Sequence, residues 1–83
     1  MDAQIVKEAV LDIIQRKIEI LKERGVFVVD YAELLLRLER IGYTEDEVRA
    51  AIIELVKAKE LKTGKYADGK GWLRDFRNMD RTE

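Results

Sequence analysis

The chain has 83 residues, of which 16 are basic and 17 acidic, so its formal net charge is −1. It contains no Cys, His, Pro or Ser. These absences exclude a disulfide framework, the usual zinc ligand sets, and Ser-His or Cys-His catalysis. We therefore expect a protein that is not an enzyme, with no catalytic residues, no metal site and no cofactor.

A chain of this length predicts a single domain, because either half alone would be too small to bury an adequate core. No apolar run approaches the ~18–20 residues that span a bilayer. The N-terminus also lacks a basic segment followed by an apolar core, the pattern of a secretory signal. We expect a soluble cytoplasmic protein with no membrane partner. High charge and few amides are typical of a thermophile composition.

Residues 2–24 predict one long helix, with Asp2 as N-cap and Gly25 as the residue that ends it. Its aliphatic positions spread over roughly 240° of the circumference, more than packing on one side requires. We expect this helix to form a homodimer, and the alternative is a wide core helix inside one chain. The residues expected at the dimer interface are Ile5, Leu11, Ile14, Ile18 and Leu21.

Residues 26–29 are β-branched and aromatic, which predicts a short strand. A second helix follows, with Asp30 as N-cap, Glu33 completing a capping box, and Gly42 at its end. Its expected buried stripe is Tyr31, Leu34, Leu35, Leu38 and Ile41. Leu36 lies away from that stripe, as a lone exposed residue or as part of a contact patch.

The segment 44–61 predicts a third helix. Thr44 and Glu47 have the spacing of a capping box, and three acidic residues follow Thr44 directly, where they complement the helix dipole. Apolar residues recur at helical spacing and predict one buried stripe. That stripe is Val48, Ala51, Ile52, Leu55 and Val56.

Residues 61–66 and 72–76 each predict a strand, and Asp68-Gly69 between them predicts a reversing turn in a loop of four or five residues. With residues 26–29 they would form a three-stranded antiparallel sheet. We expect Trp72 and Phe76 to close this sheet against the helices. Residues 77–83 are polar and are expected to form a flexible tail.

The order long helix, short strand, helix, tight turn, helix and hairpin resembles the winged helix-turn-helix superfamily. The resemblance is carried by residues 26–76, including the YTEDEV entry into the third helix. It implies an α+β, mostly α domain over residues 1–76, with the helix-turn-helix at 30–60 and the wing at 61–76. Many members resemble transcriptional regulators that bind duplex DNA through the third helix and the wing, whereas others serve protein contacts.

Charge is distributed unevenly between these two elements. Residues 44–60 carry three basic and five acidic side chains, whereas residues 61–83 carry six basic and four acidic ones. A basic wing favours phosphate contacts, although lysines on an exposed strand also prevent aggregation. The residues expected to contact nucleic acid are Arg49, Lys57, Lys62, Lys65, Tyr66, Lys70 and Arg74.

The primary hypothesis is therefore a small dimeric winged-helix protein that binds duplex DNA and regulates transcription. The third helix also carries acids and an outward-facing Ile53, which do not suit a groove lined with phosphates. The alternative hypothesis is a protein–protein interaction module that docks a partner on the Ile53 face and binds no DNA.

Overall fold

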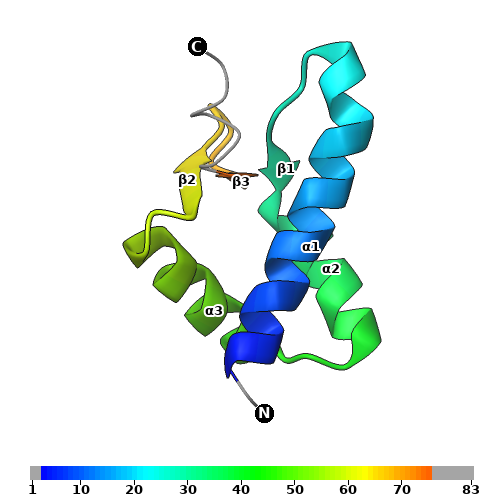
Figure 1. The fold of residues 1–83 in the computed structure, drawn as a ribbon. Coiled ribbons are helices and arrows are strands. Elements are labelled where there is room, and N and C mark those ends of the chain that lie inside the picture. The colour runs from blue at the N-terminus through cyan, green and yellow to red at the C-terminus, as the bar shows by residue number, and fades with distance from the viewer. Residues whose placement is uncertain (1–2, 76–83) are drawn as a thin grey trace.

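The computed structural model describes residues 3–75. It is an α+β fold, mostly α, in which three helices pack against a small sheet (Figure 1). The elements in chain order are α1 (Ala3–Leu21), a 3₁₀ turn (Lys22–Arg24), β1 (Val29–Asp30), α2 (Tyr31–Ile41), α3 (Glu45–Lys57), β2 (Leu61–Lys65) and β3 (Gly71–Asp75). No helix in the described part of the chain is long and apolar enough to cross a membrane.

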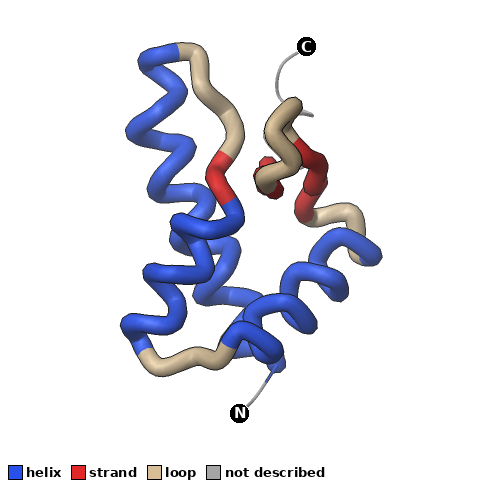
Figure 2. The backbone as a smooth tube through the Cα atoms, turned by 180° about the vertical axis from the view of Figure 1, so that it is seen from behind, coloured by secondary structure: helices blue, strands red, loops and turns tan. Residues whose placement is uncertain are grey.

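The three strands pair antiparallel in the order β1-β3-β2. The central strand β3 pairs with β2 along its whole length, from Leu61 opposite Asp75 to Lys65 opposite Gly71. It also pairs with β1, through Val29 opposite Leu73. The view from behind shows the strands beside one another and the helices outside them (Figure 2). The predicted hairpin, its five-residue loop and the three-stranded sheet are thus confirmed.

The core is built on α1. Its buried side chains recur every four residues, at Val6, Val10, Ile14 and Ile18, and each is at most 2% exposed. This row packs against α2, α3, β1 and β3. Because Ile14 and Ile18 are covered within their own chain, the structure corrects their expected place at a dimer interface. Of the other residues expected there, Ile5 is exposed, and Leu11 and Leu21 are half-buried.

The ends of the first helix differ slightly from the prediction. Regular α-helix stops at Leu21, and the 3₁₀ turn carries the chain on to Gly25. Gly25 has a left-handed φ of 73°, which confirms it as the residue that ends the helix. The expected N-cap, Asp2, lies outside the described residues, as do Phe76 and the expected tail at 77–83.

The first strand was predicted at residues 26–29, but β1 comprises only Val29 and Asp30. Val26 and Phe27 are each 36% exposed and lie outside the sheet. The Phe27 ring instead lies beneath the guanidinium of Arg74, 5.7 Å from the ring centroid. Side-chain packing against β3 has replaced strand pairing at this point.

The capping box predicted for α2 is wrong. Asp30 occupies the N-cap position, but its carboxylate makes no capping hydrogen bond. It accepts the Tyr66 hydroxyl instead, and Glu33 pairs with Lys17 of α1. Both carboxylates therefore interact with residues distant in sequence and do not form the local capping motif. The buried stripe is also shorter than expected, because Ile41 is 66% exposed.

Helix α3 begins as predicted and ends early. The Thr44 hydroxyl accepts the Glu47 N–H at 3.2 Å, and the Glu47 carboxylate accepts the Thr44 N–H at 2.9 Å, which confirms the capping box. Residues 44–61 were expected to be helical, but α3 ends at Lys57. Lys59 has a left-handed φ of 61°, and Glu60 N–H donates to the Leu55 carbonyl at 2.9 Å. This is a Schellman ending, in which lysine occupies the position that glycine prefers.

We predict that Lys59→Gly raises the free energy of unfolding by about 0.5–1 kcal/mol, because glycine adopts a positive φ without the steric penalty of a Cβ atom. Urea denaturation measures the change. Ala58→Gly is the matched control, since Ala58 has an ordinary φ of −80°, and it is expected to lower stability. Equal or reduced stability of the Lys59→Gly variant would contradict a left-handed helix end.

Candidate functional site

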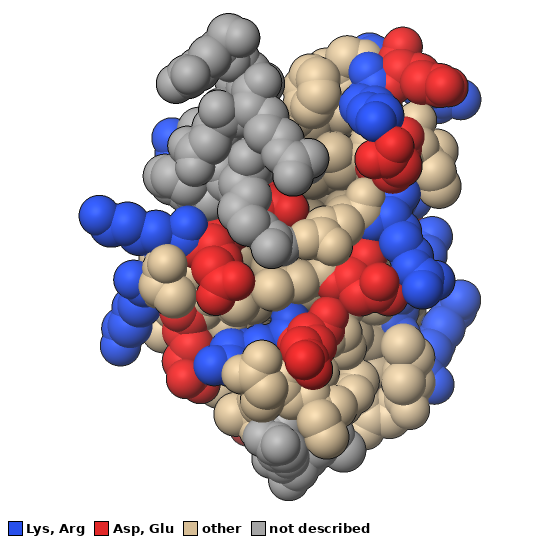
Figure 3. Space-filling model, in the orientation of Figure 1, with Lys and Arg blue, Asp and Glu red and all other residues tan. Residues whose placement is uncertain are grey.

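The hairpin carries basic side chains that no acidic side chain of the described part of the chain neutralises. Lys62, Lys65 and Lys70 are exposed, and among residues 3–75 they make no ion pair. The same is true of Lys57 at the end of α3. Basic side chains project from the edge of the molecule where α3 and β2 lie (Figure 3). The excess of basic residues after residue 60 is visible in the sequence. The fold places Lys57 and these lysines on adjoining elements.

Several charges in the first half of the chain are paired. Arg16 pairs with Asp12 on α1 at 3.2 Å, Lys22 of the 3₁₀ turn pairs with Glu19 at 2.6 Å, and Arg37 on α2 lies 3.8 Å from Glu33. The formal net charge of the chain is close to zero, but the lysines of the hairpin face solvent. Such segregation creates a local positive potential that the total charge does not reveal.

The acidic residues on α3 are also partly neutralised. Glu54 pairs with Lys7 of α1 at 3.7 Å, and Glu45 pairs with Arg49 at 3.4 Å. All of these groups are on the surface, where each pair contributes little stability. These ion pairs matter more for the approach of a phosphate than for stability, because a cation lies beside two of the acidic side chains of α3. The number of acidic residues on α3 therefore overestimates the repulsion between this helix and a phosphate.

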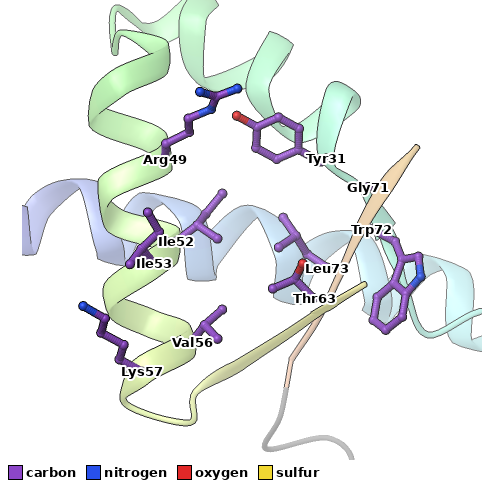
Figure 4. Close-up of a pocket in the computed structure, with 10 residues that line it drawn as sticks. All are labelled: Tyr31, Arg49, Ile52, Ile53, Val56, Lys57, Thr63, Gly71, Trp72 and Leu73. Atoms are coloured by element: carbon purple, nitrogen blue, oxygen red, sulfur yellow. The ribbon is translucent and has the colours of Figure 1, made fainter. Parts of the chain in front are cut away.

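The two faces of the hairpin differ. Leu73 points towards α3 and is 2% exposed, whereas Trp72 points the other way (Figure 4). The indole covers Gly64 so closely that a Cβ atom there would lie 2.3 Å from Trp72 Cζ2. The expectation that Trp72 closes the sheet against the helices is wrong. Successive side chains of β3 point to opposite faces of the sheet, so Trp72 lies on the outer face, where Gly64 leaves space for the indole.

Arg74 lies on the same outer face, opposite Lys62 in the strand register. Its guanidinium covers the Phe27 ring, and its Nε atom is buried with no hydrogen-bond partner among residues 3–75. Arg74 is therefore half-buried and held by a cation–π contact, unlike the three exposed lysines of the hairpin.

The tip of the hairpin is fixed to the start of α2. The Tyr66 hydroxyl donates to Asp30 Oδ1 at 2.6 Å, and the Tyr66 N–H donates to the Lys70 carbonyl at 2.8 Å. Lys70 N–H donates to Asp68 Oδ1 at 3.0 Å and closes the turn. Tyr66 was expected to contact nucleic acid. The residue is 37% exposed, but its hydroxyl already donates to Asp30.

A groove of about 520 Å³ separates α3 from the hairpin and was not predicted from the sequence. Arg49 lies at one end and Lys57 at the other, with aliphatic side chains between them (Figure 4). The lining residues are Tyr31, Arg49, Ile52, Ile53, Val56, Lys57, Thr63, Gly71, Trp72 and Leu73. The outward-facing Ile53 was the sequence signal that could have revealed it.

Comparisons with protein families, curated proteins and solved structures find no match. Among residues 3–75 no three His, Cys, Asp or Glu side chains are grouped so that they could hold a metal ion.

The hydrogen bond from Tyr66 to Asp30 raises the pKa of Tyr66 from 10.0 to about 12. We predict that Asp30→Ala returns this pKa towards 10.0, as measured by NMR of the tyrosine Cζ carbon. Since the folded pKa is raised, the stabilising contribution is fully present below pH 10 and is lost as the pH rises to about 12. Tyr66→Phe should accordingly be less stable than the parent protein at neutral pH. The difference in stability between the two proteins should be smaller above about pH 12.

Glu33→Gln is the control, because Glu33 is also near the start of α2 but does not contact Tyr66. A Tyr66 pKa that remains near 12 in Asp30→Ala would show that Asp30 is not its cause.

Proposed function

We propose that the chain is a winged helix-turn-helix protein that binds duplex DNA and acts as a small transcriptional regulator. The element order and the three-stranded sheet support the fold assignment. The observation that carries the function is the set of exposed hairpin lysines that make no ion pair within residues 3–75, namely Lys62, Lys65 and Lys70, next to α3. Unpaired surface cations gain most from phosphates, because binding releases the counterions condensed on DNA.

In this proposal α3 enters the major groove and the hairpin lies along the backbone. Arg49, exposed in the middle of α3, supplies the side chain best suited to a guanine edge. Lys57 and the hairpin lysines contact phosphates and fix the register of the complex. Lys62 and Arg74 are cross-strand neighbours of like charge, and a phosphate between them would relieve their repulsion.

We also propose that two copies associate through α1, which would set the spacing of two DNA half-sites. Ile20 of α1 is 69% exposed, and Ile41 of α2 is 66% exposed. Both line a hollow of about 230 Å³ between these helices, whose rim carries Arg16 and Asp12. An aliphatic surface with charges of both signs at its rim suits self-association, since each copy can present cations to the acids of the other.

The DNA hypothesis is tested by fluorescence anisotropy with duplex DNA over a range of salt concentrations. We predict that Lys65→Ala/Lys70→Ala weakens binding to all sequences alike and reduces the slope of log K against log salt by about 2. The matched control is Lys22→Ala/Arg24→Ala, which removes the same charge from exposed positions in the 3₁₀ turn, outside the hairpin and the proposed dimer contact, and should leave the slope unchanged. Absence of binding by the parent protein at low salt would refute the proposal.

Dimerisation is tested by sedimentation velocity at micromolar concentration, where we expect a dimer for the parent protein and a monomer for Ile20→Glu. Burying a charge in an aliphatic contact opposes association. Ile53→Glu is the control, because Ile53 is 54% exposed on a different helix and should not affect this contact. A monomeric parent protein would show that α1 does not pair copies.

One observation favours the second hypothesis, in which the domain docks another protein. Ile53 is 54% exposed on α3 and borders the apolar groove. A protein partner would use this aliphatic surface and make little use of the hairpin lysines. The salt-dependent titration separates the two hypotheses, because a docking module would show no lysine-dependent affinity for DNA.

A further inference from the structure

The groove between α3 and the hairpin has the size and lining of a small-molecule site. Its volume of about 520 Å³ falls inside the range of roughly 300–1,000 Å³ that is usual for ligand pockets. Ile52, Val56 and Leu73 form its aliphatic part, and Ile53 borders the opening. Pockets of this kind bind apolar bodies and fix them with a few polar groups.

The polar groups gather at one end. Figure 4 shows the Tyr31 hydroxyl and the Arg49 guanidinium pointing towards one another. The Tyr31 hydroxyl is buried and donates to no acceptor among the described residues. A guanidinium can donate hydrogen bonds but cannot accept one, so Arg49 cannot satisfy the hydroxyl proton. This end of the groove therefore lacks an acceptor.

Arg49 keeps donors available for such an acceptor. Its Nη2 atom lies 3.4 Å from Glu45, and this contact uses one corner of a group with five N–H donors. A hydrogen bond to the Tyr31 hydroxyl first, and the Glu45 carboxylate second, raise the pKa of Arg49, so the cation persists. The Arg49 side chain is 63% exposed and covers the hydroxyl, and rotation of this flexible chain would admit a ligand oxygen between the two donors.

We propose that this groove binds a small amphipathic carboxylate, with its anionic end on Arg49 and Tyr31 and its apolar body along Ile52, Val56 and Leu73. A carboxylate accepts a bidentate pair from arginine and a third bond from a hydroxyl. A neutral apolar molecule would leave the Tyr31 proton unpaired. A dianion is disfavoured because Glu45 lies beside the only cation at this end of the groove, within the described residues.

Occupation of the groove would affect DNA binding if the proposed function is correct, because the ligand would engage Arg49 and lie between α3 and the hairpin. Ligand binding itself does not depend on that function. It is measured on the full chain without DNA, so failure of the DNA titration leaves the ligand experiment intact.

The probe is 2-naphthylacetate, and its neutral amide, 2-naphthylacetamide, is the matched compound. Methyl ¹H–¹³C NMR follows the titration through Ile52, Ile53, Val56 and Leu73. We expect these signals to move, while those of Ile20 and Ile41, exposed in the hollow between α1 and α2, stay in place. The carboxylate should bind roughly tenfold more tightly than the amide, as expected for charge-assisted hydrogen bonds.

Tyr31→Phe keeps the ring and removes the hydroxyl, so it should reduce the preference for the carboxylate several-fold while the groove methyl signals still move. Tyr43→Phe is the control, since Tyr43 does not line the groove and should retain the full preference.

Equal affinity for the carboxylate and the amide would overturn the proposal, as would an undiminished preference in Tyr31→Phe. Parallel movement of the Ile20 and Ile41 signals would indicate non-specific apolar binding and would also overturn it. If an acidic, leucine-containing helical peptide shifts the groove signals and 2-naphthylacetate does not, the groove is a protein-docking surface and the carboxylate site is rejected.

Discussion

The structure depends on the row of aliphatic side chains along α1. Val6, Val10, Ile14 and Ile18 are each at most 2% exposed, and through them α1 packs against the other two helices, β1 and β3. Burial of this row contributes to the hydrophobic core that stabilises so small a domain. It also holds the N-terminal helix against the sheet, in which β2 and β3 come from the end of the described chain. The sheet in turn fixes the position of the hairpin relative to α3.

This packing has an electrostatic consequence. Because α1 lies against α2 and α3, its charged residues meet theirs, as in the pairs Lys17–Glu33 and Lys7–Glu54. The hairpin lysines have no such neighbours within residues 3–75. A domain that is almost neutral in total thus carries exposed lysines on its hairpin, and these lysines are the basis for proposing DNA as partner. The same surface adjoins an apolar groove, so polyanion binding and small-ligand binding can be coupled through Arg49.

Several elements could be predicted from local sequence because a local interaction determines them. The Thr44–Glu47 capping box and the turn at Gly25 depend on residues a few positions apart, and both form as expected. The Asp30–Glu33 pair has similar spacing but does not cap α2, since Tyr66 and Lys17 compete for the two carboxylates. A local motif therefore predicts structure only where its side chains do not interact instead with residues distant in sequence.

The sequence by itself determined the helices, the hairpin and the surplus of cations near the C-terminus, because helical periodicity, glycine turns and charge are properties of neighbouring residues. Only the tertiary structure decided that Ile14 and Ile18 are core, that Trp72 lies on the outer face of the sheet over Gly64, and that a groove separates α3 from the hairpin. Each of these depends on which side of an element meets another element, and that choice is made by packing across the whole chain.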